Sequence, residues 1–181
     1  ISNRRFLYDI KQRLKDIEMQ QWLSEIFLDQ RKNINQSNKL RVYRTFKTKY
    51  EYEDYLDEIT NIKHRINFTK LRISNHSLEI EKGRHQRPYV KPKDRVCQTC
   101  KLETEDEAHF LLRCPTYQML RETLFAKMKS KDNFDANTIS QEMLFLKLIN
   151  PVRKSMREIA KFASDCLDKR AQVISTLATN R

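Results

Sequence analysis

Three of the four cysteines and one of the four histidines of this chain lie between residues 97 and 114. Their spacing is C-x2-C-x8-H-x4-C. A C-x2-C turn directs two sulfurs into one corner of a tetrahedron, and a histidine and a cysteine downstream can close it. Thiolates select zinc among the metals of the cell. The pattern predicts one zinc ion held by these four residues: Cys97, Cys100, His109 and Cys114.

Four protein ligands fill the tetrahedral coordination of zinc and leave no position for a catalytic water, so the predicted zinc is structural. Local signals agree. The sequence Thr104–Glu107 reads T-E-D-E, a capping box that would start a short helix carrying His109. Pro115 suits the first turn of a following helix, and Cys114 would lie at its N-terminus, where the helix dipole favours a thiolate. The alternative is a helical hairpin with buried thiols.

The other histidines and the fourth cysteine are weaker candidates for metal ligands. His76 and His85 flank the segment before the cysteines, and either can replace one of the four ligands. His64 lies in the basic run K-H-R, where a solvated or phosphate-contacting side chain is expected. Cys166 falls on an apolar helical stripe, so we expect a core or interface thiol.

The apolar periodicity predicts an all-α fold into which the zinc site and a basic irregular loop are inserted. Helices are expected at 2–32, 40–46 and 52–66, and the segment 72–95 is expected to be irregular because it contains Gly83 and two prolines. Further helices follow at 115–131 and 139–149 and from Asn150, with Asn150 as N-cap and Pro151 in the first turn. The chain divides into an N-terminal helical segment (1–60), the basic loop with the zinc region (61–131) and C-terminal helices (132–181), together one compact unit.

The last helix carries a heptad seam with one polar member. Such a seam can hold a second copy of the chain or a partner helix. Its residues are Val152, Met156, Ile159, Ala163, Cys166, Arg170, Val173 and Leu177.

A formal net charge of +12 favours polyanions, nucleic acid first. Between residues 61 and 95 ten basic residues face three acidic ones. Phe68 and Tyr89 lie in the same tract and can stack on unpaired bases. The alternative is a solvated loop that keeps the protein soluble. The candidate nucleic-acid contacts are Lys63, Arg65, Lys70, Arg72, Lys82, Arg84, Arg87, Lys91, Lys93 and Arg95.

Several classes of function are excluded or disfavoured. A Gly-rich phosphate loop or a dinucleotide-binding fingerprint needs several glycines, and this sequence has only one. No hydrolytic constellation or polymerase metal motif stands out, so the chain is expected not to be catalytic. The clustered thiols without a secretory signal indicate an intracellular, reducing compartment, and no apolar run is long enough to span a membrane. The chain begins at Ile1 without an initiator methionine, which suggests a piece of a longer protein.

The stretches KHRINFTKLRISNHSLEIEKGRH and RVCQTCKLETEDEAHFLLRCPTYQMLR resemble the C-terminal zinc-binding (CCHC) region of non-LTR, LINE-type retrotransposon reverse transcriptases. The resemblance covers about residues 60–125, with His76 and Gly83 in the matching loop. It implies that the four predicted ligands bind zinc and that the parent is a reverse transcriptase with an endonuclease, or a domesticated copy. It further implies a region beyond the polymerase domain that holds template RNA or target DNA during target-primed reverse transcription, in the nucleus when it acts on DNA.

Two other functions stay open on the sequence. A protein-interaction or dimerisation module would use the heptad seam and need zinc only for its architecture. An enzyme fragment would be completed by another chain, such as the rest of the parent polyprotein.

Overall fold

The structure is a computed structural model that describes residues 3–27, 40–132 and 134–179. The chain forms two compact units, Ile1–Tyr52 and Glu53–Arg181. Helices dominate both, and the described residues contain no strand beyond a single antiparallel bridge between Val96 and Thr104. The predicted all-α fold class is therefore confirmed.

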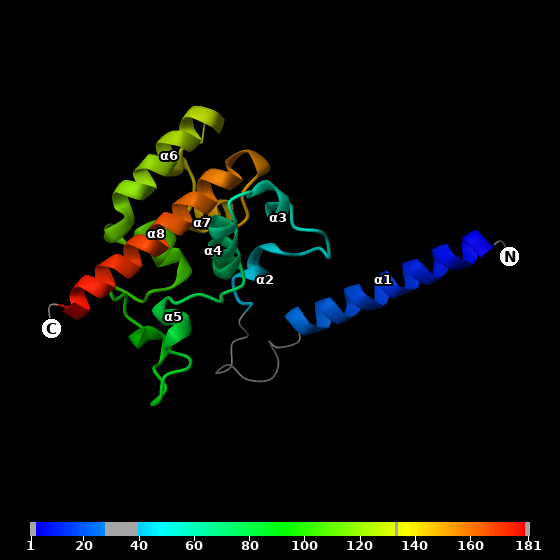
Figure 1. Cartoon of the computed structure of the whole chain (residues 1–181), viewed down its shortest axis with the longest axis horizontal. Helices are drawn as coiled ribbons and strands as arrows, with labels where there is room; N and C mark the ends of the chain where they lie inside the picture. The colour runs from blue at the N-terminus through cyan, green and yellow to red at the C-terminus, as the bar shows by residue number, and fades with distance from the viewer. Residues whose placement is uncertain (1–2, 28–39, 133, 180–181) are drawn as a thin grey trace. The chain divides into compact units, whose positions relative to one another are not determined.

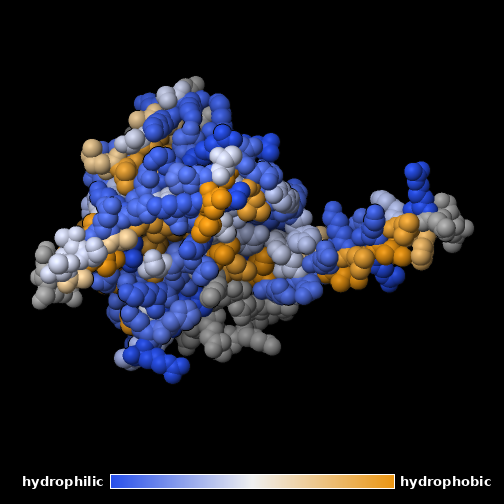
Figure 2. Space-filling view, viewed as in Figure 1, coloured by the Kyte–Doolittle hydropathy of each residue, from blue (hydrophilic) through white to orange (hydrophobic). Residues whose placement is uncertain are grey.

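The first unit contains α1 (Asn3–Phe27) and α2 (Tyr43–Phe46). The rings of Trp22 and Tyr50 pack with their centroids 5.7 Å apart. Apolar side chains along α1, which include Leu7 and Leu14, are exposed, and Figure 2 shows a hydrophobic stripe along this helix. The long first helix is confirmed as far as Phe27; the predicted residues 28–32 lie outside the described part of the chain.

The second unit is built around its longest helix, α8 (Arg153–Thr179), as Figure 1 shows. This helix packs against α3 (Tyr55–Glu58), α4 (Ile62–Arg72) and α6 (Gln118–Asp132). The core on α8 is formed by Met156, Ile159, Ala160, Ala163 and Cys166, which are all buried. The helices of this unit are α3 (Tyr55–Glu58), α4 (Ile62–Arg72), α5 (Glu79–Lys82), α6 (Gln118–Asp132), α7 (Gln141–Ile149) and α8 (Arg153–Thr179).

Several predicted helix boundaries differ from the structure, and two of the differences have a clear local cause. The helix expected over 52–66 is interrupted at Ile59, whose extended backbone buries its side chain, and α4 begins afresh because the side chain of Asn61 accepts a hydrogen bond from the His64 amide. The last helix begins at Arg153, not at Asn150. Asn150 instead ends α7, where its amide donates to the Leu146 carbonyl.

The heptad seam of α8 faces other helices of the same chain. Asn67 on α4 donates to the hydroxyl of Ser164 on α8 at 2.9 Å, and the middle of the seam is buried between these helices. The two ends, Val152 and Leu177, are 68% and 44% exposed. The central seam residues are thus part of the core of the second unit and are not an open surface for a partner helix.

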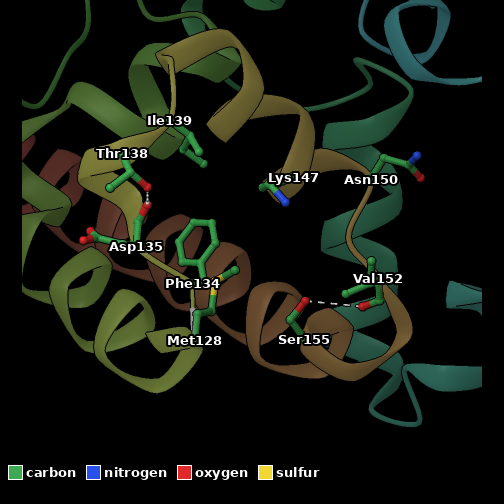
Figure 3. Close-up of a pocket in the computed structure, with 9 residues that line it drawn as sticks. All are labelled: Met128, Phe134, Asp135, Thr138, Ile139, Lys147, Asn150, Val152 and Ser155. Carbon is green, nitrogen blue, oxygen red and sulfur yellow. Dashed lines mark hydrogen bonds between the residues drawn. The ribbon is translucent and has the colours of Figure 1, made fainter. Parts of the chain in front are cut away.

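A cavity of about 470 Å³ lies between the end of α6 and the start of α8 (Figure 3). Met128, Phe134 and Ile139 give it apolar walls, and the ammonium group of Lys147 lies 6.0 Å from the centre of the Phe134 ring. Among the described residues, no helix combines the length and the apolar character that crossing a bilayer requires.

Substitutions on the seam test whether it is core. Ile159→Ala should lower the free energy of unfolding by about 2–5 kcal/mol, because it leaves a cavity between packed helices. Val152→Ala, at the exposed end of the same seam, should change it by less than about 0.5 kcal/mol. Urea unfolding of both variants measures the difference, and equal small effects would show that the seam is not buried as described.

Candidate metal centre

The four predicted ligands converge. The ligand atoms of Cys97, Cys100, His109 and Cys114 all lie within 4.8 Å of one another. The sulfurs of Cys97 and Cys114 are 4.0 Å apart, and the Cys100 sulfur lies 3.3 Å from Nε2 of His109. A tetrahedral zinc with the usual bond lengths has edges of about 3.8 Å between sulfurs and about 3.6 Å between sulfur and nitrogen. The donor set therefore fits a tetrahedral metal ion.

The turn that carries Cys97 and Cys100 is fixed by backbone hydrogen bonds. The Cys97 amide donates to the Glu103 carbonyl at 2.9 Å, next to the bridge between Val96 and Thr104. The Lys101 amide donates back to the Cys97 carbonyl at 3.0 Å, and Lys101 takes a left-handed φ of 60° to close the turn. The chain thus folds both sulfurs toward the same point.

His109 lies on a short helix whose cap differs from the prediction. Asp106, not Thr104, caps it: the His109 amide donates to the Asp106 carboxylate at 2.6 Å. Thr104 is engaged in the bridge and its hydroxyl donates to the Lys93 carbonyl, so it is too far back to serve as the cap. The helical segment His109–Arg113 is a π-turn, a wider coil that is frequent at functional sites.

Cys114 lies where the sequence predicted it, directly before the turn that Pro115 begins. Pro115 opens a short 3₁₀ turn that leads directly into α6, and Cys114 stands at its start. Arg121 fixes this point by donating from Nη2 to the Cys114 carbonyl at 2.8 Å. The hydroxyl of Thr99 lies 3.2 Å from the Cys97 sulfur and 3.5 Å from the Cys114 sulfur, so it can donate to either.

The cysteines and the histidine of this cluster shift one another's pKa. The contact with Cys114 lowers the pKa of Cys97, and the same contact raises the pKa of Cys114, as for one proton shared between two sulfurs. Burial alone would lower the pKa of His109, but its contacts with Cys97 and Glu103 outweigh burial and raise it. Nδ1 of His109 lies 3.0 Å from a Glu103 oxygen, outside hydrogen-bond alignment. A cation in place of these protons would satisfy all four donors at once.

The remaining histidines and the fourth cysteine lie outside the cluster. Nε2 of His76 is 2.6 Å from a carboxylate oxygen of Glu107, in a buried contact. His85 is exposed, and His64 lies in the first turn of α4. Cys166 is fully buried in the core, where burial raises the pKa of its thiol.

A buried ion pair connects the cluster to α8. Arg170 donates from Nε and Nη2 to the two carboxylate oxygens of Glu105, at 2.7 and 2.6 Å. One of these oxygens is 3.5 Å from the Cys97 sulfur, and the other accepts from the Glu79 amide at 2.9 Å. Burial raises the pKa of Glu105 even though Arg170 opposes the shift. Nothing in the sequence pattern pointed to Glu105, and Arg170 appeared only as a polar exception in a seam.

The only glycine of the sequence is explained by Arg95, a buried residue directly before the cysteine turn. A Cβ on Gly83 would lie 2.7–2.8 Å from Arg95 side-chain atoms, so the arginine can cross the backbone only at a glycine. Arg95 donates to the carbonyls of Ile80 and Val90, at 2.5 and 3.0 Å. It thereby ties α5 to the segment that leads into the metal cluster.

The ten predicted nucleic-acid contacts fall into three groups. Arg72 and Arg95 are buried, with Arg72 bound to Glu53 and to the Ile149 carbonyl. Arg65 and Arg84 are half-buried and donate to the Leu56 carbonyl and to Glu81. A guanidinium inside the core does not reach a phosphate, so Arg72 and Arg95 hold the fold instead. The exposed group comprises Lys63, Lys70, Lys82, Arg87, Lys91 and Lys93.

The two aromatic residues predicted to stack on bases, Phe68 and Tyr89, also differ in their exposure to solvent. Phe68 is only 1% exposed and packs edge-on against Tyr55, so it is not available to a base. Tyr89 is 52% exposed, and the guanidinium of Arg95 lies 5.3 Å from the centre of its ring. Tyr89 alone remains as a candidate stacking surface.

Comparison of the chain with protein-family models, with curated proteins and with solved structures finds no match. The account of this centre therefore depends on its own geometry.

The cluster predicts a metal stoichiometry. Purified protein should contain one divalent metal ion per chain, and Cys97→Ser and Cys114→Ser should each lower that content severalfold because three donors hold the ion less tightly. Cys166→Ala is the matched control, since this thiol is buried elsewhere and its loss should leave the metal content unchanged. Elemental analysis measures all four proteins; full metal content in Cys97→Ser would refute the ligand set.

Proposed function

We propose that this chain is a zinc-containing nucleic-acid-binding domain that contacts its ligand through the basic loop, defined as residues 84–95. The observation that carries the proposal is the exposure of Arg87, Lys91 and Lys93 on this loop. Their charged groups make no hydrogen bond or ion pair within the described residues. Exposed cations without acidic partners are available to phosphates, and each contact releases counterions.

Tyr89 adds a contact to bases. Arg95 lies against its ring, and more than half of the side chain is open to solvent. An aromatic ring held on one side and open on the other suits stacking on an unpaired base, which is tolerant of sequence. Single-stranded RNA or DNA is therefore the ligand class that the loop suits best.

Zinc is the metal that the donor set favours. Three thiolates and one imidazole are soft and borderline ligands in a tetrahedral arrangement, which zinc accepts without redox chemistry. All four positions would be filled by the protein, so zinc here would hold the shape of residues 97–114 and carry out no reaction. We therefore propose that this chain binds and does not catalyse.

The motif resemblance supplies a biological setting for the proposal. A CCHC region beyond a reverse transcriptase domain would hold template RNA or target DNA during target-primed reverse transcription, in contact with the rest of the parent protein and in the nucleus when it acts on DNA. The alternative, a protein-interaction module that uses the heptad seam, has less support, because α3, α4 and α6 of the same chain pack on that seam.

A salt series tests the proposal. For single-stranded RNA, the triple variant Arg87→Ala/Lys91→Ala/Lys93→Ala should bind more weakly, and its slope of log K against log salt should be shallower by about 2 if each lost contact contributes about 0.7. Fluorescence anisotropy with labelled RNA and with duplex DNA measures both quantities.

The matched control removes the same charge from α1, as Lys11→Ala/Arg13→Ala/Lys15→Ala, three exposed residues of the first unit. The control should keep the slope of the unmodified protein. An affinity that does not respond to salt, or a loop variant that binds like the control, would contradict the proposal.

A further inference from the structure

A second cavity, of about 320 Å³, opens at the start of α4, where α6 and α8 pass close by. Its walls bring together three cations from two helices: Lys127 from α6, and Arg157 and Lys161 from α8. Asn61 and His64 contribute from the first turn of α4. Three cations that converge on one hollow from separate helices form an electropositive site that the basic tract of the sequence did not include.

The three cations of this cavity differ in how strongly the protein itself engages them. The ammonium group of Lys127 makes no hydrogen bond or ion pair in the described part of the chain. Lys161 pairs with Asp165 one turn away, in an exposed contact that contributes little and exchanges readily. Arg157 donates from Nε to the Glu58 carbonyl at 2.7 Å, which fixes the direction of its guanidinium.

The acidic groups at this place are already engaged. Glu158 is the one carboxylate in the wall, and it is bound by Lys131 from α6. The Glu58 carboxylate pairs with Arg157 at 3.6 Å and with Arg153, which lies outside the wall, at 3.3 Å. The cavity therefore keeps an excess of positive charge where it is open.

We propose that this cavity binds one phosphate group of a nucleic-acid strand, through Lys127, Arg157 and Lys161. The amides of the first turn of α4 add donors, because only the His64 amide is capped by Asn61. A phosphate offers several strong acceptors to groups that arrive from different directions, which a single carboxylate does not.

This inference rests on the proposed function and extends it, because it gives the strand a second point of attachment. α4 runs from the cavity at Asn61 to Arg72, ahead of α5 and the basic loop (Figure 1). Its 11 residues span about 16 Å at 1.5 Å per residue. A strand that reaches both places would gain affinity that a short oligonucleotide lacks.

The test uses the full chain with the double variant Lys127→Ala/Lys161→Ala, two exposed side chains outside the core. For a long single-stranded RNA, the salt slope should become shallower by about 1.4, two contacts at about 0.7 each, while a short RNA that covers only the loop should bind as before. The control Lys129→Ala/Lys147→Ala removes the same charge from exposed positions away from this cavity and should change neither.

A second arm uses inorganic phosphate as the probe, followed by NMR at the amides of Asn61 to His64. If the double variant keeps the RNA slope while the basic-loop variant loses it, the loop binds nucleic acid and the cavity does not, which overturns this inference alone. If phosphate shifts these amides but the RNA slope is unchanged, the site serves small phosphates and the inference again fails. If the unmodified protein does not bind RNA, both the proposed function and this inference fall.

Discussion

The ion pair between Arg170 and Glu105 joins the longest helix of the second unit to the loop that carries the metal cluster. Both side chains are buried. The Glu105 carboxylate also accepts a hydrogen bond from the Glu79 amide and lies beside the Cys97 sulfur. A buried carboxylate without a cation would strongly destabilise the fold. Glu105 can therefore be buried here only because Arg170 pairs with it. The metal cluster is thus anchored to the helical core by a charge contact as well as by packing.

The same arrangement accounts for the shape of the basic loop. Arg95 crosses the backbone at Gly83 and binds the Ile80 carbonyl of α5, while the Glu105 amide donates to the Arg95 carbonyl. Arg95, the last residue of the loop, is therefore joined both to α5 and to the segment that carries the metal cluster. On this loop the guanidinium of Arg95 also lies against the ring of Tyr89. In the proposed function, a bound metal would act on the nucleic acid only through the loop that it would help to fix.

The sequence predicted that Cys97, Cys100, His109 and Cys114 come together, because the local spacing carries the signal: a C-x2-C turn, a histidine on a short helix and a cysteine before Pro115. It failed where the deciding contact is distant. Thr104 satisfied the capping pattern, but the bridge to Val96 removed it from the helix. The sequence predicted Arg72 as a surface charge, but it is buried in the core, where it pairs with Glu53 and donates to the Ile149 carbonyl. Periodicity found the seam of α8 but could not say that the partner helices belong to the same chain.

The central claim is that Arg170 supports the metal loop through Glu105, and a double-mutant cycle followed by urea unfolding of the metal-loaded protein tests it most directly. Arg170→Met should lower the free energy of unfolding by about 3–5 kcal/mol, because it leaves a buried carboxylate without its partner. Adding Glu105→Gln should recover much of that loss, since the uncompensated charge is removed. A loss below about 1 kcal/mol, as for an exposed pair, or strictly additive effects of the two substitutions, would contradict the account.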